Sequence, residues 1–294
     1  MDITLALGGG GAKGNAHIGV LRLLERERFR IRAIAGTSFG GIVACFYAAG
    51  YSPDGIQEAF SAVDQSRLYG REHEDGPAFL GLSRVRQWLK RTLGDRTFED
   101  ARVPCAVTAV DIRTSREVVI KEGLMRHGIL CTIALPGIFP SYLKKEGLEL
   151  VDGGLLNPVP VAIARALAPT LPVVAVSLSA PLGTPPRALP MPFLEGLPGP
   201  LAARISHLRV TQAMDVFMRS IDIGGRQIAE LRFMLEKPDV VIRPDVAGIG
   251  ALDRVHVGRV ADLGEQAARE KLPELRKATT WTTRLRRLAT KRRS

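Results

Sequence analysis

The first fifty residues alternate twice between a short apolar run and a stretch with helical spacing of apolar positions. Nearly continuous apolar runs are typical of strands that are buried on both faces of a parallel sheet. The order strand, helix, strand, helix therefore predicts an α/β fold with a parallel core. The predicted elements are strands at residues 3–7 and 31–35, a helix from Asn15 onward, and a helix at residues 42–49 that ends at Gly50.

The alternation continues after residue 80 with longer helices and with two strands that flank a polar turn. Those two strands, at residues 104–112 and 117–121, predict a pair. The helix predicted at residues 83–93 opens with a cap at Ser83. The remaining predicted strands lie at residues 148–151, 173–178 and 240–244, and the remaining predicted helices lie within 201–236 and at 260–270.

One segment, residues 181–200, breaks the pattern because it is rich in proline. Proline excludes a regular helix and a central strand there. Leucine, methionine and phenylalanine side chains lie between the prolines, so the segment can be an apolar lid or a surface connection folded onto the core. Long irregular loops are more often functional than neutral, which favours the lid.

Composition is that of an ordinary globular protein, with 46 % apolar and 24 % charged residues among 294. Aromatic residues make up only 5 %, so a stacking platform for bases is not indicated and no nucleic-acid partner is expected. The net charge of +11 is uneven, because residues 271–294 hold nine Lys or Arg and one Glu. We therefore expect one domain at residues 1–270 and a basic tail at 271–294.

The basic tail allows three interpretations, of which nucleic-acid binding is disfavoured by the few aromatic residues. Trp281, Leu285 and Leu288 follow helical spacing among basic residues, which resembles a helix that lies on a membrane surface. On this interpretation residues 276–293 make transient contact with an anionic membrane. A solvated, disordered tail is the alternative.

Cysteine and histidine usage bears on compartment and metal binding. Cys45, Cys105 and Cys131 are isolated, which favours a reducing compartment over a disulfide framework. The five histidines do not occur at metal-ligand spacing, so no metal is expected. The N-terminal residues lack the basic and apolar regions of a secretory signal. We expect a cytoplasmic protein that can associate peripherally with the inner face of the membrane.

The candidate chemistry starts at Gly36-Thr37-Ser38-Phe39-Gly40, which follows a predicted strand and precedes a predicted helix. A serine on such a turn is placed to attack an acyl carbonyl, and the flanking glycines allow the turn to bend sharply. Unpaired N–H groups at the start of the helix also favour negative charge at this point. Ser38 is therefore a candidate nucleophile.

A glycine run, Gly8 to Gly11 with Lys13 and Gly14, follows the first strand. Glycines let backbone N–H groups approach a substrate oxygen and point the same way, so the run can stabilise an oxyanion. The run also fits the Gly-x-Gly-x-x-Gly dinucleotide pattern, but no acidic residue ends the second strand. It is not a P-loop, because Lys13 is followed by Gly14 rather than Ser or Thr.

Acyl transfer also needs a base. Asp152 follows the strand at residues 148–151 and is a candidate, although Asp-Gly is also a common turn signal. Asp111 is better interpreted as a hydrogen-bonded turn residue. Ser38, Asp152 and His256 obey the chain order of an α/β-hydrolase triad, but His256 lies in a segment expected at the surface.

Taken together, the segments 9–14, 36–40 and 152–154 resemble the three signatures of patatin-like phospholipases in order and approximate spacing. Leu-Pro-Gly-Ile-Phe-Pro at residues 135–140 is similar to a Pro-x-x-Phe-x-Pro element of that family. The resemblance covers residues 3–165. The last signature reads Asp-Gly-Gly where many members have Asp-Gly-Ala, a difference that leaves the aspartate in place.

The resemblance implies a three-layer α/β/α domain with a mostly parallel central sheet, acting on acyl esters of phospholipids, lysophospholipids or neutral lipids without a cofactor. It implies Ser38 as nucleophile, Asp152 as general base, and an oxyanion hole from backbone amides of the run Gly9, Gly10 and Gly11, in which Gly10 and Gly11 are the favoured donors. The residues implied to support these motifs are Lys13, Gly14, Gly36, Gly40, Gly153 and Gly154. Two alternatives stay open: the Ser-Asp-His triad, and a non-catalytic lipid- or nucleotide-binding module in which Ser38 is structural.

Overall fold

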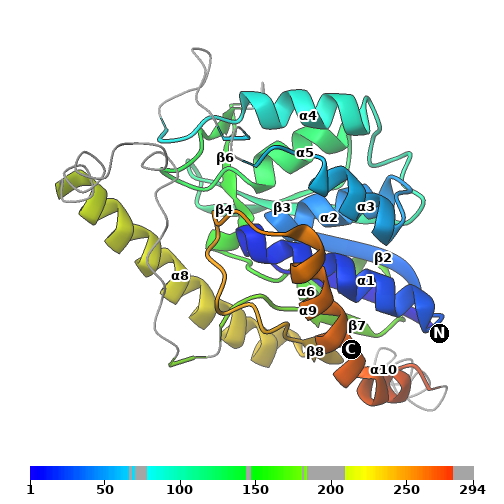
Figure 1. Cartoon of the computed structure of the whole chain (residues 1–294). Helices are drawn as coiled ribbons and strands as arrows, with labels where there is room; N and C mark the ends of the chain where they lie inside the picture. The colour runs from blue at the N-terminus through cyan, green and yellow to red at the C-terminus, as the bar shows by residue number, and fades with distance from the viewer. Residues whose placement is uncertain (66–67, 70–77, 144–146, 181, 184–208, 281–294) are drawn as a thin grey trace.

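A computed structural model describes the chain except for residues 66–67, 70–77, 144–146, 181, 184–208 and 281–294 (Figure 1). The described strands form one eight-stranded sheet in the order β5-β6-β3-β2-β1-β7-β8, with β4 also paired to β3. β1, β2, β3, β7 and β8 pair in parallel, whereas β4, β5 and β6 form antiparallel pairs. The strands are β1 (Asp2–Leu7), β2 (Arg30–Thr37), β3 (Cys105–Asp111), β4 (Arg116–Ile120), β5 (Tyr142–Leu143), β6 (Glu149–Asp152), β7 (Val173–Val176) and β8 (Val240–Ile242).

Alternate side chains of the central strands enter two separate cores, which gives the domain three layers. Leu5 and Leu7 of β1 pack with side chains of α1, α2 and α9 on one face of the sheet. Ala6 of β1 and Ala35 of β2 point to the other face, where they pack with α6. The helices are α1 (Ala16–Arg26), α2 (Phe39–Ala48), α3 (Pro53–Ser61), α4 (Ser83–Leu93), α5 (Met125–Thr132), α6 (Val161–Leu167), α8 (Arg209–Glu236), α9 (Val257–Glu270) and α10 (Leu272–Ala278), with 3-10 turns η1 (Gly11–Asn15) and η2 (Gly153–Leu155).

The predicted α/β class with a mostly parallel sheet is confirmed, and most predicted elements are present. α4 has the predicted bounds, but the cap was wrong: Leu82 is the N-cap and Ser83 is the first helical residue. α2 begins at Phe39, three residues before the prediction, because the Ser38 turn leads directly into the helix. α3, α5 and α6 were missed, since helices of two turns offer too few apolar repeats to reveal a period.

The first residues of the expected basic tail are folded. α10 follows α9 directly, and its Leu275 is only 1 % exposed. Arg276 of α10 binds Glu27 at the end of α1 at 2.8 Å. The folded part of the chain therefore continues past residue 270. Residues 281–294, which hold most of the expected membrane-binding segment, lie outside the described residues, as does most of the proline-rich segment 181–200.

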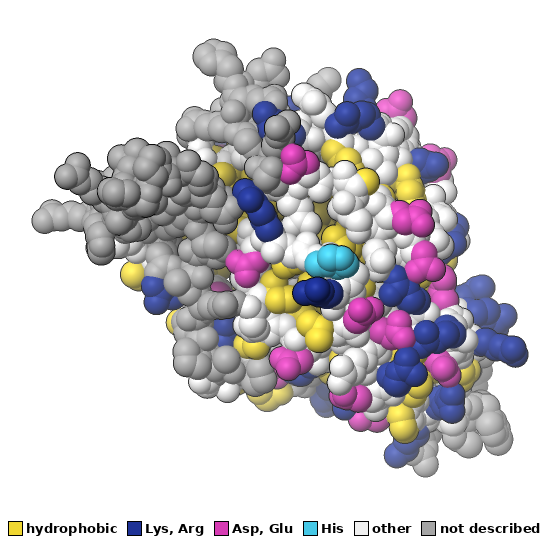
Figure 2. Space-filling view, in the orientation of Figure 1, with side chains coloured by type: hydrophobic (Ala, Val, Ile, Leu, Met, Phe, Trp, Pro, Cys, Tyr) yellow, Lys and Arg dark blue, Asp and Glu magenta, His cyan; other side chains and the backbone are white. Residues whose placement is uncertain are grey.

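The charged surface has both signs mixed together. In Figure 2 basic and acidic side chains alternate over much of the face that is drawn. Arg22 of α1 binds Asp54 of α3 at 2.8 Å, and Arg26 of α1 binds Glu265 of α9 at 2.8 Å. Such pairs tie the outer helices together, although exposed ion pairs contribute little stability individually.

α8 is much longer than the other helices and runs along one side of the domain, with one end projecting away from the sheet (Figure 1). One side of α8 is buried, as Met218, Arg226 and Ala229 show, while Phe233 packs near α6. No helix among the described residues is both long and apolar enough to cross a membrane.

The sheet register brings three distant segments together. The parallel strands β1 and β2 end side by side, with Leu7 aligned to Gly36, so Gly8 and Ser38 emerge at the same edge. β3 aligns Thr108 with Thr37 of β2 and the next residue, Ala109, with Asp152 of β6. The carboxyl edge of a parallel sheet is where ligand sites form in α/β folds.

Candidate active site

Ser38 occupies the turn between β2 and α2 in a backbone conformation that side chains rarely adopt, with φ 54° and ψ −126°. Such strain persists only where the surroundings hold it, and it is common at functional sites. A Cβ at Gly36 would lie 2.3 Å from the Gly40 carbonyl oxygen, and one at Gly40 would lie 2.3 Å from that of Leu7. The Ser38 N–H donates to Thr132 Oγ1 at 2.8 Å, which fastens the turn to α5.

The glycine loop lies beside Ser38 and leaves two N–H groups without an acceptor among the described residues, those of Gly10 and Gly11. The Gly9 N–H donates instead to the Pro158 carbonyl at 3.0 Å. Gly11 has φ 57°, and a Cβ there would overlap the Ala251 carbonyl oxygen at 2.1 Å. The loop can therefore offer two backbone donors, at the two positions of the Gly9–Gly11 run that the resemblance favours.

His17 anchors the glycine loop from α1. Because a carbonyl can only accept, its Nε2 donates to the Gly8 oxygen at 2.8 Å. Complete burial lowers the pKa of His17 to about 4, so the imidazole is neutral at physiological pH. Gly14 also has a packing role, because a Cβ there would lie 2.2 Å from the Phe39 ring. Lys13, which follows the glycine run, lines the same cavity as Ser38 and Asp152.

Asp152 ends β6 and is only 4 % exposed. Burial raises the pKa of its carboxyl to about 6, against the opposing effect of hydrogen bonds from the Ser38 hydroxyl and the Gly154 N–H. The Gly154 N–H lies 2.7 Å from Asp152 Oδ1. A buried carboxylate with few donors is a stronger base than an exposed one, and the candidate nucleophile is one of the groups that act on the pKa of this carboxylate.

Side chains beneath the site hold the serine and aspartate segments in register. The Thr37 hydroxyl donates to the Asn157 carbonyl at 2.8 Å and lies 2.9 Å from the Thr108 hydroxyl. Gly153 packs directly on β3, since a Cβ there would lie 2.1 Å from Thr108 Oγ1. The Asp152 N–H is also satisfied, by the Ala134 carbonyl at 2.9 Å.

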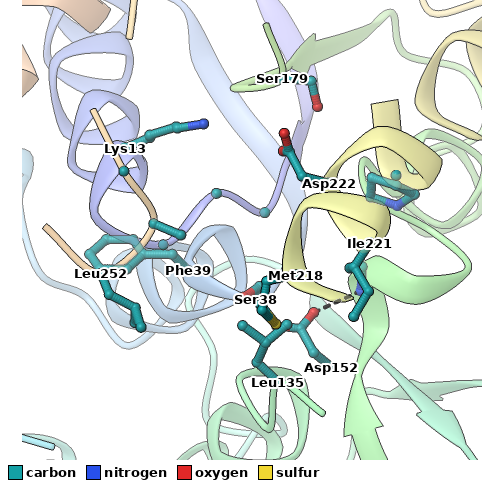
Figure 3. Close-up of a pocket in the computed structure, with 18 of the residues that line it drawn as sticks. Lys13, Ser38, Phe39, Leu135, Asp152, Ser179, Met218, Ile221, Asp222 and Leu252 are labelled. Carbon is teal, nitrogen blue, oxygen red and sulfur yellow. Dashed lines mark hydrogen bonds between the residues drawn. The ribbon is translucent and has the colours of Figure 1, made fainter. Parts of the chain in front are cut away.

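Ser38 and Asp152 lie in a cavity of about 230 Å³, which we call the Ser38 cavity. Figure 3 shows apolar side chains around them and polar side chains on the opposite wall. The apolar residues labelled near Ser38 and Asp152 are Leu135, Met218 and Ile221, and the polar ones farther away are Lys13, Ser179 and Asp222. The cavity is therefore amphiphilic.

Two elements line this cavity whose contribution to it was not predicted from the sequence. α8 contributes Met218, Ile221 and Asp222, and the loop at residues 249–252 covers the glycine run. Neither carries a motif. The only signal was the helical spacing within 201–236, which does not say which face of α8 points inward.

His256, the third member of the alternative triad, does not line the Ser38 cavity. It caps α9, where its Nδ1 accepts the Arg259 N–H at 3.3 Å. Asp111 is a hydrogen-bonded turn residue, as the sequence predicted: its carboxylate accepts the Thr114 hydroxyl at 2.5 Å and the Glu149 N–H at 3.1 Å. Within the described parts of the chain, no three His, Cys, Asp or Glu side chains gather as a metal site would require.

A family model described as patatin-like phospholipase matches residues 5–165, more than half of the chain. The chain belongs to the patatin-like phospholipase family. The match contains all three segments that meet at the Ser38 cavity.

Relatives at the level of sequence include bacterial and mammalian proteins. An uncharacterised NTE family protein of Mycobacterium tuberculosis is 31 % identical over 63 % of this chain and 51 % of its own length. A second such protein of that species is 28 % identical over 92 % of this chain and 46 % of its own length. Human patatin-like phospholipase domain-containing protein 6 is 31 % identical over 56 % of this chain and 12 % of its own length. The chain thus spans about half the length, or less, of these relatives.

The fold resembles that of VipD from Legionella pneumophila, a solved structure. The TM-score is 0.54 over 94 % of this chain and 67 % of that one, with 11 % sequence identity. This likeness confirms the patatin-like arrangement of sheet and helices.

Proposed function

We propose that this patatin-like protein is a serine acyl hydrolase of lipid esters, of the phospholipase A or lysophospholipase type, that uses a Ser38–Asp152 dyad. The observation that carries the proposal is the placement of Ser38 and the buried Asp152 carboxyl in one cavity, where the Ser38 hydroxyl is one of the two groups that oppose the rise in the pKa of that carboxyl. This cavity is amphiphilic, and the N–H groups of Gly10 and Gly11 lie beside it.

In the first step Ser38 Oγ attacks the ester carbonyl carbon while Asp152 accepts the hydroxyl proton. The negative charge that forms on the carbonyl oxygen is stabilised by the N–H groups of Gly10 and Gly11. These donors are already fixed by the turn, so they need no reorganisation during the reaction. Collapse of the tetrahedral intermediate breaks the ester bond, and Asp152 returns its proton to the leaving alcohol oxygen.

In the second step water attacks the acyl-Ser38 ester, and Asp152 accepts a proton from that water. The two glycine N–H groups again stabilise the oxyanion. Its collapse breaks the bond between Ser38 Oγ and the acyl carbon, Asp152 returns its proton to Ser38 Oγ, and the fatty acid is released. A pKa of about 6 leaves Asp152 mostly ionised at pH 7 while making it a better base than an ordinary aspartate.

The Ser-Asp-His triad is disfavoured by the position of His256 at the N-cap of α9. The non-catalytic alternative gives no reason for the strained φ of 54° at Ser38. Both alternatives make different predictions for the same set of variants.

The proposal is tested with a panel of phospholipids, lysophospholipids and neutral esters, assayed with wild type, Ser38→Ala and His256→Ala. We expect wild-type hydrolysis of at least one lipid ester, its loss in Ser38→Ala, and activity within about twofold of wild type in His256→Ala. Equal hydrolysis by Ser38→Ala would contradict the assignment, and loss of activity in a folded His256→Ala would favour the triad.

A further inference from the structure

A second cavity of about 90 Å³ lies next to the Ser38 cavity, and we call it the Trp88 cavity. The two share six lining residues, all apolar: Phe39, Ile42, Tyr69, Ile133, Ala251 and Leu252. We propose that the Trp88 cavity receives the far end of the substrate's acyl chain, so that it sets the chain-length preference of the enzyme. The inference rests on the proposed acyl-hydrolase function.

Phe39, the residue that follows Ser38, lies between the two cavities and lines both of them. Phe39 and Ile42 lie one turn apart on α2, and both face the two cavities. The Phe39 ring packs against Gly14 on one side and meets Phe60 edge-on at 5.6 Å on the other. A chain attached to Ser38 would therefore reach the residues that separate the two cavities, beginning with Phe39.

The lining of the Trp88 cavity suits an alkyl chain. Most of the residues that line this cavity alone are apolar, among them Phe60, Val63, Val85 and Trp88, while the polar ones are Asn15, Gln65, Asp253 and Arg254. Trp88 belongs to an aromatic cluster in which it stacks on Phe46 at 5.3 Å. Apolar walls favour a ligand that has no hydrogen-bonding groups, such as an alkyl chain.

Polar side chains at the Trp88 cavity already serve the surrounding loops. The Gln65 amide exchanges two hydrogen bonds with the Val255 backbone, at 2.9 and 3.0 Å. The Asn15 amide donates to the Ala12 carbonyl at 2.9 Å, and Asp253 accepts the Gly250 N–H at 2.7 Å. These bonds hold the walls in place, and Asn15 Oδ1 is left buried without a hydrogen-bond partner among the described residues.

The Ser38 cavity, by contrast, has a polar wall as well as an apolar one, and this difference orients an amphiphilic substrate. Lys13, Ser179 and Asp222 lie away from Leu135 and Ile221 in Figure 3. An amphiphilic ester bound at Ser38 would place its polar portion toward the former group. Its acyl chain would then leave along Phe39 toward the Trp88 cavity.

The inference predicts that activity grows with acyl length until the Trp88 cavity is filled. Each buried methylene should raise kcat/KM about fourfold over that range. Blocking the Trp88 cavity should remove this gain for long chains and leave short chains unaffected, because a short chain ends within the Ser38 cavity.

The test uses a reversible block at Val63, a half-buried residue after α3 that lines the Trp88 cavity and not the Ser38 cavity. Val63→Cys is labelled in the folded enzyme with hexyl methanethiosulfonate, and the label is later removed with dithiothreitol. The native cysteines Cys45, Cys105 and Cys131 are all buried. Val119→Cys, at an exposed position on β4 that lines neither cavity, is the matched control.

kcat/KM is measured for esters of one alcohol with acyl chains from butyrate to palmitate in mixed micelles. We expect labelled Val63→Cys to lose at least about tenfold on palmitate and less than about twofold on butyrate, with full recovery after reduction. Labelled Val119→Cys should keep the wild-type profile.

An unchanged chain-length profile in fully labelled Val63→Cys would overturn the inference while leaving the acyl hydrolase intact. An effect equal for all chain lengths would also overturn it, because it would show a general disturbance. A wild type that hydrolyses no ester, or a Ser38→Ala variant of equal activity, would instead refute the proposed function itself.

Discussion

Two strand-end turns in this protein each carry a buried aspartate, and they shift the pKa of its carboxyl in opposite directions. Asp111 ends β3 and Asp152 ends β6, which pairs with β3, and the two residues are 1 % and 4 % exposed. The Asp111 turn surrounds its carboxylate with donors: the hydrogen bond from Thr114 contributes most to lowering its pKa, and the N–H groups of Glu149 and Arg113 add to it.

The Asp152 turn gives its carboxylate only the Gly154 N–H and the Ser38 hydroxyl, so burial dominates and the pKa rises to about 6. Both turns follow strands of one sheet, and both carboxyls are removed from solvent. The balance between desolvation, which dominates at Asp152, and fixed donors, which dominate at Asp111, therefore decides which aspartate can act as a base and which is a structural anion.

Replacement of each aspartate by asparagine should produce the largest difference between the two turns. We expect Asp152→Asn to lower kcat/KM about 1,000-fold or more, because the Ser38 proton loses its acceptor. Asp111→Asn should change kcat/KM less than about threefold when assayed well below its melting temperature. Steady-state kinetics of both variants on one ester decides the matter, and similar losses in both would remove the distinction between the turns.

The two turns also differ in packing, because Gly153, which follows Asp152, lies directly against Thr108. Gly153→Ala should lower the free energy of unfolding by about 1–3 kcal/mol and reduce activity, because its Cβ would lie 2.1 Å from Thr108 Oγ1 and 2.6 Å from the Thr108 carbonyl. Urea denaturation measures the change.

The Asp111 turn offers the matched variant, since Ser115 there has φ 56°. Ser115→Gly should change the free energy of unfolding by less than about 1 kcal/mol, because relief of strain opposes the added freedom of the unfolded chain. A larger loss in Ser115→Gly than in Gly153→Ala would contradict this view of the packing.

The two pKa shifts also predict opposite effects of pH on stability. The raised pKa of Asp152 means that the folded protein favours the protonated form. Its contribution is therefore stabilising below the unfolded value of 3.8 and is lost as pH rises through about 6. Asp152→Asn should consequently raise the free energy of unfolding at pH 8 by about 1–2 kcal/mol.

For Asp111 the sign is reversed, because its lowered pKa stabilises the fold above 3.8 and that contribution is lost as pH falls. Asp111→Asn should therefore be less stable than wild type at pH 8, with the difference shrinking toward pH 3. Urea denaturation across this pH range tests both signs, and a destabilised Asp152→Asn at pH 8 would be evidence against burial as the dominant cause.

Much of this contrast could be predicted from the sequence because it is local. Glycines flanking Ser38, an Asp-Gly turn after a short strand, and a polar turn after Asp111 are all visible in the order of residues. The three site segments were predicted to meet, and the sheet register brings them together.

Other features depend on contacts between distant parts of the chain and leave no local signal. The Gly9 N–H is taken by Pro158, so Gly9 differs from Gly10 and Gly11 although all three look alike in the sequence. Thr132, which accepts the Ser38 N–H, lies on a two-turn helix that the periodicity did not reveal. The inward face of α8 is likewise chosen by packing.

The most direct test of the central claim is the rate at which a fluorophosphonate labels Ser38 as pH is varied. We predict that wild type is labelled at Ser38 with a rate that rises through an apparent pKa of about 6. Asp111→Asn should keep that rate and inflection, whereas Asp152→Asn should be labelled at least about 100-fold more slowly and without the inflection. Labelling of Asp152→Asn at the wild-type rate, with the same pH dependence, would contradict the assignment of Asp152 as the base.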